Sequence, residues 1–210
     1  MYFNQQQYKS YINDRLFYNR TLYKLDVIIG KDQKVMCGSK VYVELLKGQD
    51  YSIIDQKIEN KIFSVGMSNN RLLNTGIIGM KLKGERIIKE QNSHNFYKIT
   101  IQDILDNKIS DIKEKIRIFS HENNFEQAYM CGDTIEVLYT LYDISYNIIK
   151  KEKTSFIIGD TNIHPVLNLS VENMQKGTKR TVIFNNSVDI TQLFDQKTHK
   201  DSLLIMEISC

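Results

Sequence analysis

Alternation of apolar and polar residues marks two stretches of this 210-residue chain as strands buried on one face, Val41–Leu45 and Ile135–Tyr139. Each stretch follows a Met-Cys-Gly sequence, Met36–Gly38 and Met130–Gly132, and these two sequences lie 94 residues apart. Further pairs keep an offset of 93 or 94 residues: Val43 and Val137, Phe63 and Phe156, Gly66 and Gly159, Met80 and Met174, Gly84 and Gly177. The sequence therefore predicts a tandem duplication.

One amphipathic helix is predicted in each unit, because apolar residues recur at i, i+4 and i+7. These residues are Leu73, Ile77 and Met80 in the first unit, and Leu167, Val171 and Met174 in the second. Further strands are predicted at 25–29, 85–88 and 96–101, and again at 116–119, 179–184 and 203–208. The pattern predicts the α+β class, a mostly antiparallel sheet wrapped around one short helix, formed twice.

The pattern also sets the expected boundaries of the domains. A basic, aromatic N-terminal extension is predicted at 1–24, a first unit at 25–105, a linker or short helix at 106–115 and a second unit at 116–210.

Composition places the chain among ordinary globular proteins, with 41% hydrophobic and 25% charged residues. No apolar run approaches the roughly 20 residues that span a bilayer, so we expect no membrane protein and no membrane partner. The N-terminus lacks the apolar stretch of a signal peptide, and three cysteines cannot all pair with one another. Both features favour a reducing compartment and predict a cytoplasmic location.

The net charge of +3 is concentrated at the N-terminus, since residues 1–24 carry four cations and only one acid, Asp14. Aromatic residues lie between these cations, and such a mixture can stack on bases and neutralise phosphates. Candidate residues for binding a partner or RNA are Lys9, Arg15, Phe17, Tyr18, Arg20 and Lys24. The alternative is a helix that packs its aromatic face on its own domain, because Tyr8, Tyr11, Arg15 and Tyr18 also follow helical spacing.

Motifs for other chemistry are missing from the sequence. The four histidines are scattered, and no His or Cys pair has the spacing of a zinc site. No phosphate-binding loop, dinucleotide motif or sign of DNA specificity is present. We therefore expect no metal and no cofactor.

The second unit resembles the FKBP-type peptidyl-prolyl isomerase domain. Gly132–Thr140 is similar to the strand that opens that domain, and Phe156–Gly159 and Lys176–Ile183 follow in the family's order. The first unit has a weaker likeness at Phe63–Gly66 and Ile78–Arg86. The resemblance implies a half-barrel of five or six strands around a helix, repeated in tandem as in larger members of the family.

The family's isomerase pocket is an apolar bowl lined by aromatic residues, and the resemblance assigns its positions in the second unit to Tyr139, Phe156, Ile163 and Leu167. Thr154 stands where the family has a phenylalanine, and Leu167 where it has a tryptophan. In the first unit, Leu45 and Lys61 replace the tyrosine and that same phenylalanine. The first unit therefore looks inactive and the second degenerate.

These observations predict a non-catalytic binding or scaffold protein. It would dock on a protein or ribonucleoprotein complex, such as the ribosome, through its N-terminal extension. The alternative is a peptidyl-prolyl isomerase or chaperone that acts through the second unit.

Overall fold

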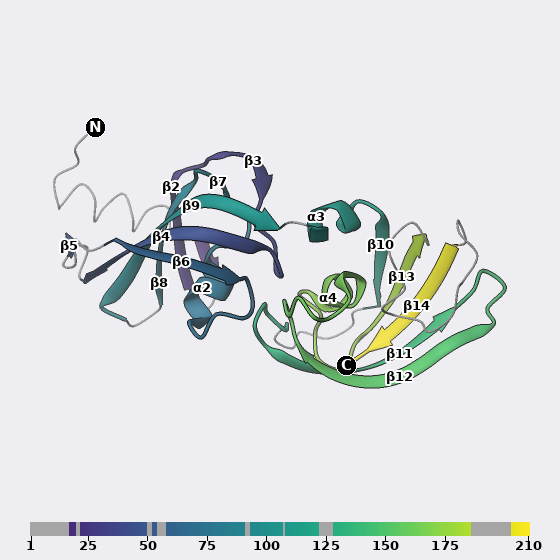
Figure 1. Cartoon of the computed structure of the whole chain (residues 1–210). Coiled ribbons are helices and arrows are strands. Elements are labelled where there is room, and N and C mark those ends of the chain that lie inside the picture. Colours follow the sequence, from purple (N-terminus) through teal and green to yellow (C-terminus); the bar gives the residue numbers. More distant parts are fainter. Residues whose placement is uncertain are drawn as a thin grey trace. The chain divides into compact units, whose positions relative to one another are not determined.

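The computed structural model describes residues 17–19, 22–49, 52–53, 58–90, 93–106, 108–121, 128–185 and 203–210. The chain divides into two compact units, Met1–Asp106 and Asn107–Cys210 (Figure 1). The predicted class is confirmed, because antiparallel strands dominate both units and the helices are few and short.

Unit 1 is built on a seven-stranded antiparallel sheet with the order β1-β2-β8-β9-β4-β5, in which β6 also pairs with β4, on the same side as β5. A small second sheet joins β3 to β7. The elements are β1 (Phe17–Asn19), β2 (Leu22–Ile28), β3 (Lys31–Lys34), β4 (Lys40–Gln49), β5 (Ser52–Ile53), β6 (Glu59–Ser64), α2 (Arg71–Gly76), β7 (Lys81–Leu82), β8 (Glu85–Glu90) and β9 (Asn95–Asp106).

Unit 2 has a five-stranded antiparallel sheet with the order β10-β13-β14-β11-β12. The elements are α3 (Lys108–Lys113), β10 (Ile116–His121), β11 (Thr134–Tyr142), β12 (Ile148–Ile157), α4 (Pro165–Val171), β13 (Lys179–Asn185) and β14 (Leu203–Ser209).

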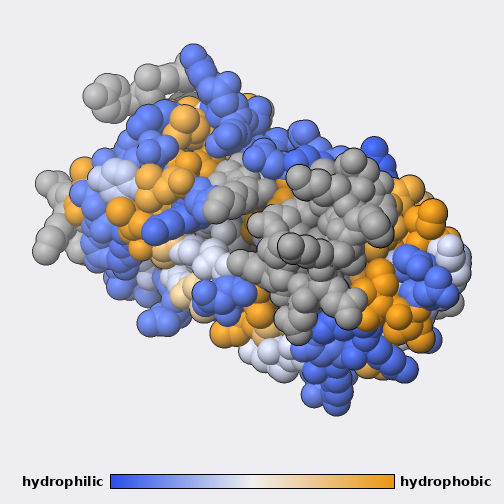
Figure 2. Space-filling model, turned by 45° about the vertical axis from the view of Figure 1, so that its right-hand side comes forward, coloured by the Kyte–Doolittle hydropathy of each residue, from blue (hydrophilic) through white to orange (hydrophobic). Residues whose placement is uncertain are grey.

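The core of each unit lies between the sheet and its helix. On β4, Val41, Val43 and Leu45 are buried, and on β11 the buried residues are Ile135, Val137, Tyr139 and Leu141. The alternation seen in the sequence thus corresponds to one buried sheet face. Hydrophobic residues still reach the surface in several places among hydrophilic ones (Figure 2).

The same contacts fix the turn before the helix in both units. Asn74 Oδ1 accepts a hydrogen bond from the Gly66 backbone N–H at 3.0 Å. Asn168, 94 residues later, accepts one from Gly159 at 2.9 Å. Both asparagines are buried, so each gives a buried backbone N–H the partner it needs.

The helices are shorter than the sequence predicts. Helix α2 ends at Gly76, and the buried residues Ile77 and Met80 lie in the turns beyond it. Gly79 has φ +82°, a left-handed conformation that ends the helical path. A Cβ on Gly76 would lie 2.6 Å from Ile88 Cδ1, so the end of the helix is pressed against β8.

Two predicted boundaries can be compared with the strands and helices. The boundary predicted at residue 24 falls inside β2, because Leu22–Ile28 forms one continuous strand paired with β8. The segment 106–115, predicted as a linker or short helix, contains the short helix α3, whose Ile109 is buried.

Candidate functional site

The four residues assigned to the isomerase bowl come from two neighbouring strands, the helix and the turn before it in unit 2. Tyr139 lies on β11, Phe156 on β12 and Leu167 on α4, while Ile163 lies in the turn before that helix. Tyr139, Phe156 and Leu167 are only 2%, 5% and 6% exposed. The structure therefore places three of the four in the packed core, and only Ile163 is half-buried.

A polar chain occupies the sheet next to Tyr139. Tyr139 pairs directly with Glu152 across β11 and β12, so both side chains lie on the same face. The Tyr139 hydroxyl donates to Glu152 Oε2 at 2.6 Å, and Lys150 Nζ lies 2.7 Å from the same oxygen. The helix-facing side of β12 is therefore polar beyond Phe156, through Thr154, Glu152 and Lys150.

This arrangement fixes the charges of its members. Burial and the hydrogen bond to Glu152 raise the pKa of Tyr139 to about 12, so the phenol stays protonated at neutral pH. The hydrogen bonds from Lys150 and Tyr139 lower the pKa of the Glu152 carboxyl. The bond to Glu152 raises the pKa of Lys150. The Tyr139 hydroxyl thus already donates a hydrogen bond to the Glu152 carboxylate.

Unit 1 has an open hollow of about 530 Å³ at the equivalent place, between β6 and the start of α2. Phe63 and Leu73 contribute its apolar lining, and Lys61, Asn69 and Asn70 contribute polar groups. Asn70 also caps α2, because its Oδ1 accepts from the Leu72 backbone N–H at 3.0 Å. Among the described residues, Phe63 is thus the one aromatic residue that lines this hollow, whereas the family resemblance implies several for an isomerase.

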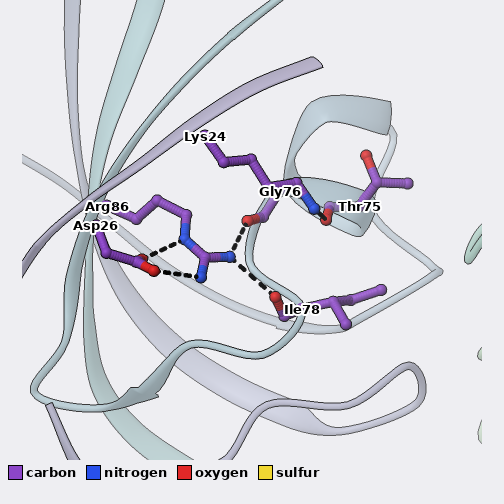
Figure 3. Close-up of polar contacts among 6 residues, drawn as sticks. All are labelled: Lys24, Asp26, Thr75, Gly76, Ile78 and Arg86. Atoms are coloured by element: carbon purple, nitrogen blue, oxygen red, sulfur yellow. Dashed lines mark hydrogen bonds and ion pairs between the residues drawn. The ribbon is translucent and has the colours of Figure 1, made fainter. Parts of the chain in front are cut away.

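A second group of charged residues lies at the end of α2 (Figure 3). Arg86 Nη1 donates to the carbonyl oxygens of Gly76 at 2.8 Å and Ile78 at 2.9 Å. The guanidinium also binds both carboxylate oxygens of Asp26, at 2.6 and 3.1 Å. Because the last carbonyls of a helix lack partners within the helix, this arginine serves as a cap.

Lys24, a predicted partner-binding residue, belongs to this same group. Its Nζ donates to the Thr75 carbonyl at 2.7 Å (Figure 3). Burial, with Arg86 nearby, lowers the pKa of Lys24 to about 8. Lys24 therefore links α2 to the sheet, and its role in partner binding stays a prediction.

The structure describes two of the other predicted contact residues. Phe17 and Tyr18 lie on β1, which pairs antiparallel with β2. Lys9, Arg15 and Arg20 lie outside the described residues.

The described residues contain neither a metal-binding cluster nor a membrane-spanning helix. No group of three or more His, Cys, Asp or Glu residues could hold a metal ion there. No helix in this part of the chain is long and apolar enough to cross a membrane.

Among known proteins, this chain is similar to solved structures that contain FKBP domains. No protein-family model and no curated protein matches this chain. Among solved structures, the three FKBP domains of wheat FKBP73 match 89% of this chain and 92% of theirs, with 15% identity and a TM-score of 0.35. FkpA from Escherichia coli matches 46% of this chain and 47% of its own, with 17% identity and a TM-score of 0.38. FKBP structures are thus among the structural neighbours of this chain. At these scores neither match assigns a role to any residue.

The sequence alone missed several residues that organise the fold of each unit. Arg180 in unit 2 repeats the role of Arg86, since its guanidinium donates to the carbonyls of Ser170, Glu172 and Asn173 at the end of α4. The offset of 94 residues that reveals the duplication also relates Arg86 to Arg180 and Asn74 to Asn168. The Tyr139–Glu152 pair has no such counterpart, because Leu45 stands at the tyrosine position in unit 1.

Proposed function

We propose that this chain is a binding protein of two tandem FKBP-like units, neither of which isomerises prolyl bonds. In this proposal it docks on a macromolecular partner, a protein or ribonucleoprotein complex such as the ribosome, through its N-terminal segment. A cytoplasmic location remains part of the proposal.

One observation carries the non-catalytic assignment: the Tyr139 hydroxyl is bound to Glu152, which is itself paired with Lys150. An apolar prolyl ring placed here would have to cover a charged pair, and burying charges without new partners is costly. Thr154 supplies another polar side chain where the family resemblance implies a phenylalanine. Unit 1 presents Lys61 and the three asparagines Asn60, Asn69 and Asn70 at the equivalent hollow.

An isomerase assay tests this assignment. Uncatalysed prolyl isomerisation takes tens to hundreds of seconds, so catalysis is easy to detect. We expect the full chain to leave the rate for a set of prolyl peptides unchanged, with a known active FKBP as positive control. Acceleration that disappears in Tyr139→Phe would show that unit 2 is an isomerase, which is the alternative function.

Docking through the N-terminal segment is tested by sedimentation with ribosomes from the source cells. A variant with Lys9, Arg15 and Arg20 changed to glutamine is compared with a control in which Lys31, Lys40 and Lys47 are changed to glutamine. These three control lysines are exposed on unit 1. We expect loss of co-sedimentation in the first variant only. The slope of log K against log salt concentration should fall in magnitude by about one unit for each lost phosphate contact. Equal behaviour of both variants would remove the N-terminal segment from the proposal.

A further inference from the structure

The face of the unit 2 sheet that points away from α4 forms a regular array of side chains. The strand register places Phe119, Thr181, Glu207, Thr140 and Lys151 in one row across the five strands. The next row is His121, Lys179, Ser209, Leu138 and Lys153. A third row contains Arg117, Ile183, Ile205 and Tyr142. These three rows are called the outer face below.

Positive charge predominates on the outer face. Arg117, Lys151, Lys153 and Lys179 are exposed cations, and Glu207 is the one carboxylate in the three rows. Lys153 pairs with Glu136 in the neighbouring row at 2.7 Å. Within the described part of the chain, Lys151 and Lys179 have no ion-pair partner. The outer face therefore suits a ligand with several negative charges.

A hollow of about 370 Å³ opens on the outer face, lined among others by His121, Thr140, Lys151, Lys179, Thr181 and Glu207. Glu207 lies in the middle, since Thr181 and Thr140 flank it on the adjacent strands. The Tyr142 hydroxyl donates to Glu207 Oε2 at 3.3 Å, which leaves the carboxylate with oxygen lone pairs for a ligand. The hollow thus offers a central acceptor with lysines on two sides.

Flat ring surfaces complete the outer face. Phe119 is 52% exposed at one end of the central row. Tyr142 lies on the opposite side of Glu207, on β11. Aromatic side chains on an exposed antiparallel sheet are a common platform for unstacked bases.

Unit 1 does not share these features. Its residues equivalent to Phe119, Thr181 and Thr140 are Leu25, Ile87 and Leu46, and Lys98 replaces Glu207. Leu25 and Ile87 are only 3% and 4% exposed. The array is therefore a property of unit 2 rather than of the fold.

We propose that the outer face of unit 2 binds single-stranded nucleic acid, with a guanine base in the hollow. The guanine N1–H and N2 amino groups donate to the two oxygens of the Glu207 carboxylate. Guanine is the base that offers two adjacent donors of this kind. Lys151, Lys179 and Arg117 contact phosphates, and a neighbouring base stacks on Phe119. This site does not involve the N-terminal segment and does not depend on the docking proposed above.

The test is fluorescence anisotropy with labelled 12-nucleotide RNAs and the full-length protein in low salt. One RNA alternates guanine with uracil, a second contains only uracil, and a third has inosine in place of guanine and so lacks the N2 amino group. We expect the guanine RNA to bind most tightly, and Glu207→Gln to abolish its advantage over the inosine RNA. A DNA strand of the same sequence shows whether the 2′-hydroxyl contributes.

Charge and stacking are tested separately on exposed positions, where substitutions leave the fold intact. Lys151→Gln with Lys179→Gln should reduce the salt slope by about 1.4, since each phosphate contact contributes about 0.7 with single strands. The control, Lys31→Gln with Lys40→Gln in unit 1, should not change it. Phe119→Ser should weaken binding about five-fold or more.

Three results would overturn the proposal: no binding of any strand, binding that the two unit 2 lysines do not affect, or binding lost only in the N-terminal variant. The last result would leave the N-terminal docking intact and remove the outer face as a site. Equal affinity for all three RNAs would remove the guanine contact with Glu207.

Discussion

Replacing Arg86 by methionine removes a buried cation and leaves its partners in place. Arg86 is 7% exposed, and its guanidinium makes four hydrogen bonds. Methionine keeps much of the volume of the aliphatic stem but has no donor. The carbonyls of Gly76 and Ile78 then lose the arginine, and Asp26 loses its ion-pair partner.

The size of the effect follows from the burial of each partner. An unsatisfied buried carbonyl costs about 1–3 kcal/mol. The bond to Gly76 is buried and the bond to Ile78 is partly buried, so the second lies at the lower end. The Asp26 side chain is 47% exposed, so water replaces much of the lost ion pair, which was worth about 1 kcal/mol or less. We expect Arg86→Met to destabilise unit 1 by about 2–4 kcal/mol.

Amide hydrogen exchange read by mass spectrometry measures this loss in each unit of the full chain. A loss of about 2–4 kcal/mol speeds exchange of the slowest amides about 30- to 700-fold. We expect this in peptides from β8 and β9, with unit 2 unchanged. Arg180→Met is the matched variant and should show the reverse distribution, because Arg180 caps α4.

Asp26→Asn separates the two roles of Arg86. If the helix carbonyls dominate, Asp26→Asn speeds exchange in unit 1 by no more than about five-fold, because it removes only the half-exposed partner. Equal effects of Asp26→Asn and Arg86→Met would refute the capping explanation and place the stabilisation in the ion pair. An effect of Arg86→Met below about five-fold would refute both.

Three further predictions concern other buried polar groups. The pKa of Tyr139 is about 12 in the folded protein and 10 in the unfolded chain. The contribution of this residue to the free energy of unfolding is therefore complete below pH 10 and is lost as the pH rises toward 12. Ultraviolet titration should show one late tyrosine that Tyr139→Phe removes. Lys24 has a pKa of about 8 against 10.5 unfolded, so the free energy of unfolding should rise between pH 8 and 10.5, and Lys24→Met should abolish that rise in urea titrations. Asn168→Ala leaves the buried Gly159 N–H unpaired and should cost about 2–4 kcal/mol in unit 2 by hydrogen exchange, whereas the exposed Asn162→Ala should cost less than about 0.5 kcal/mol.

Much of the core could be predicted from the sequence because burial on one sheet face imposes a period of two. Val41, Val43 and Leu45 follow this period and are all buried. The ends of the helices could not be predicted in this way. Ile77 and Met80 are buried at helical spacing, yet they lie in turns that Gly79 and the contact of Gly76 with Ile88 impose. Apolar spacing reports burial and does not distinguish a helix from the turn after it.

The candidate site was located in part. The family resemblance assigned Tyr139, Phe156, Ile163 and Leu167 to a bowl, but exposure depends on how closely α4 packs, and a sequence does not reveal that distance. The role of Lys24 was hidden for a related reason. A lysine beside aromatic residues suggests a surface, whereas the register of β2 with β8 brings it to the carbonyl of Thr75.

The two units differ at their surfaces and agree where the helix meets the sheet. Each has an asparagine that binds the turn before the helix and an arginine that caps the helix end, 94 residues apart. These contacts satisfy buried backbone groups, so replacing the asparagine or the arginine alone lowers the free energy of unfolding in both units. At the pocket and on the outer face the two units differ, since Leu45 corresponds to Tyr139 and Lys98 to Glu207. We therefore expect the two units to bind different ligands on a shared frame.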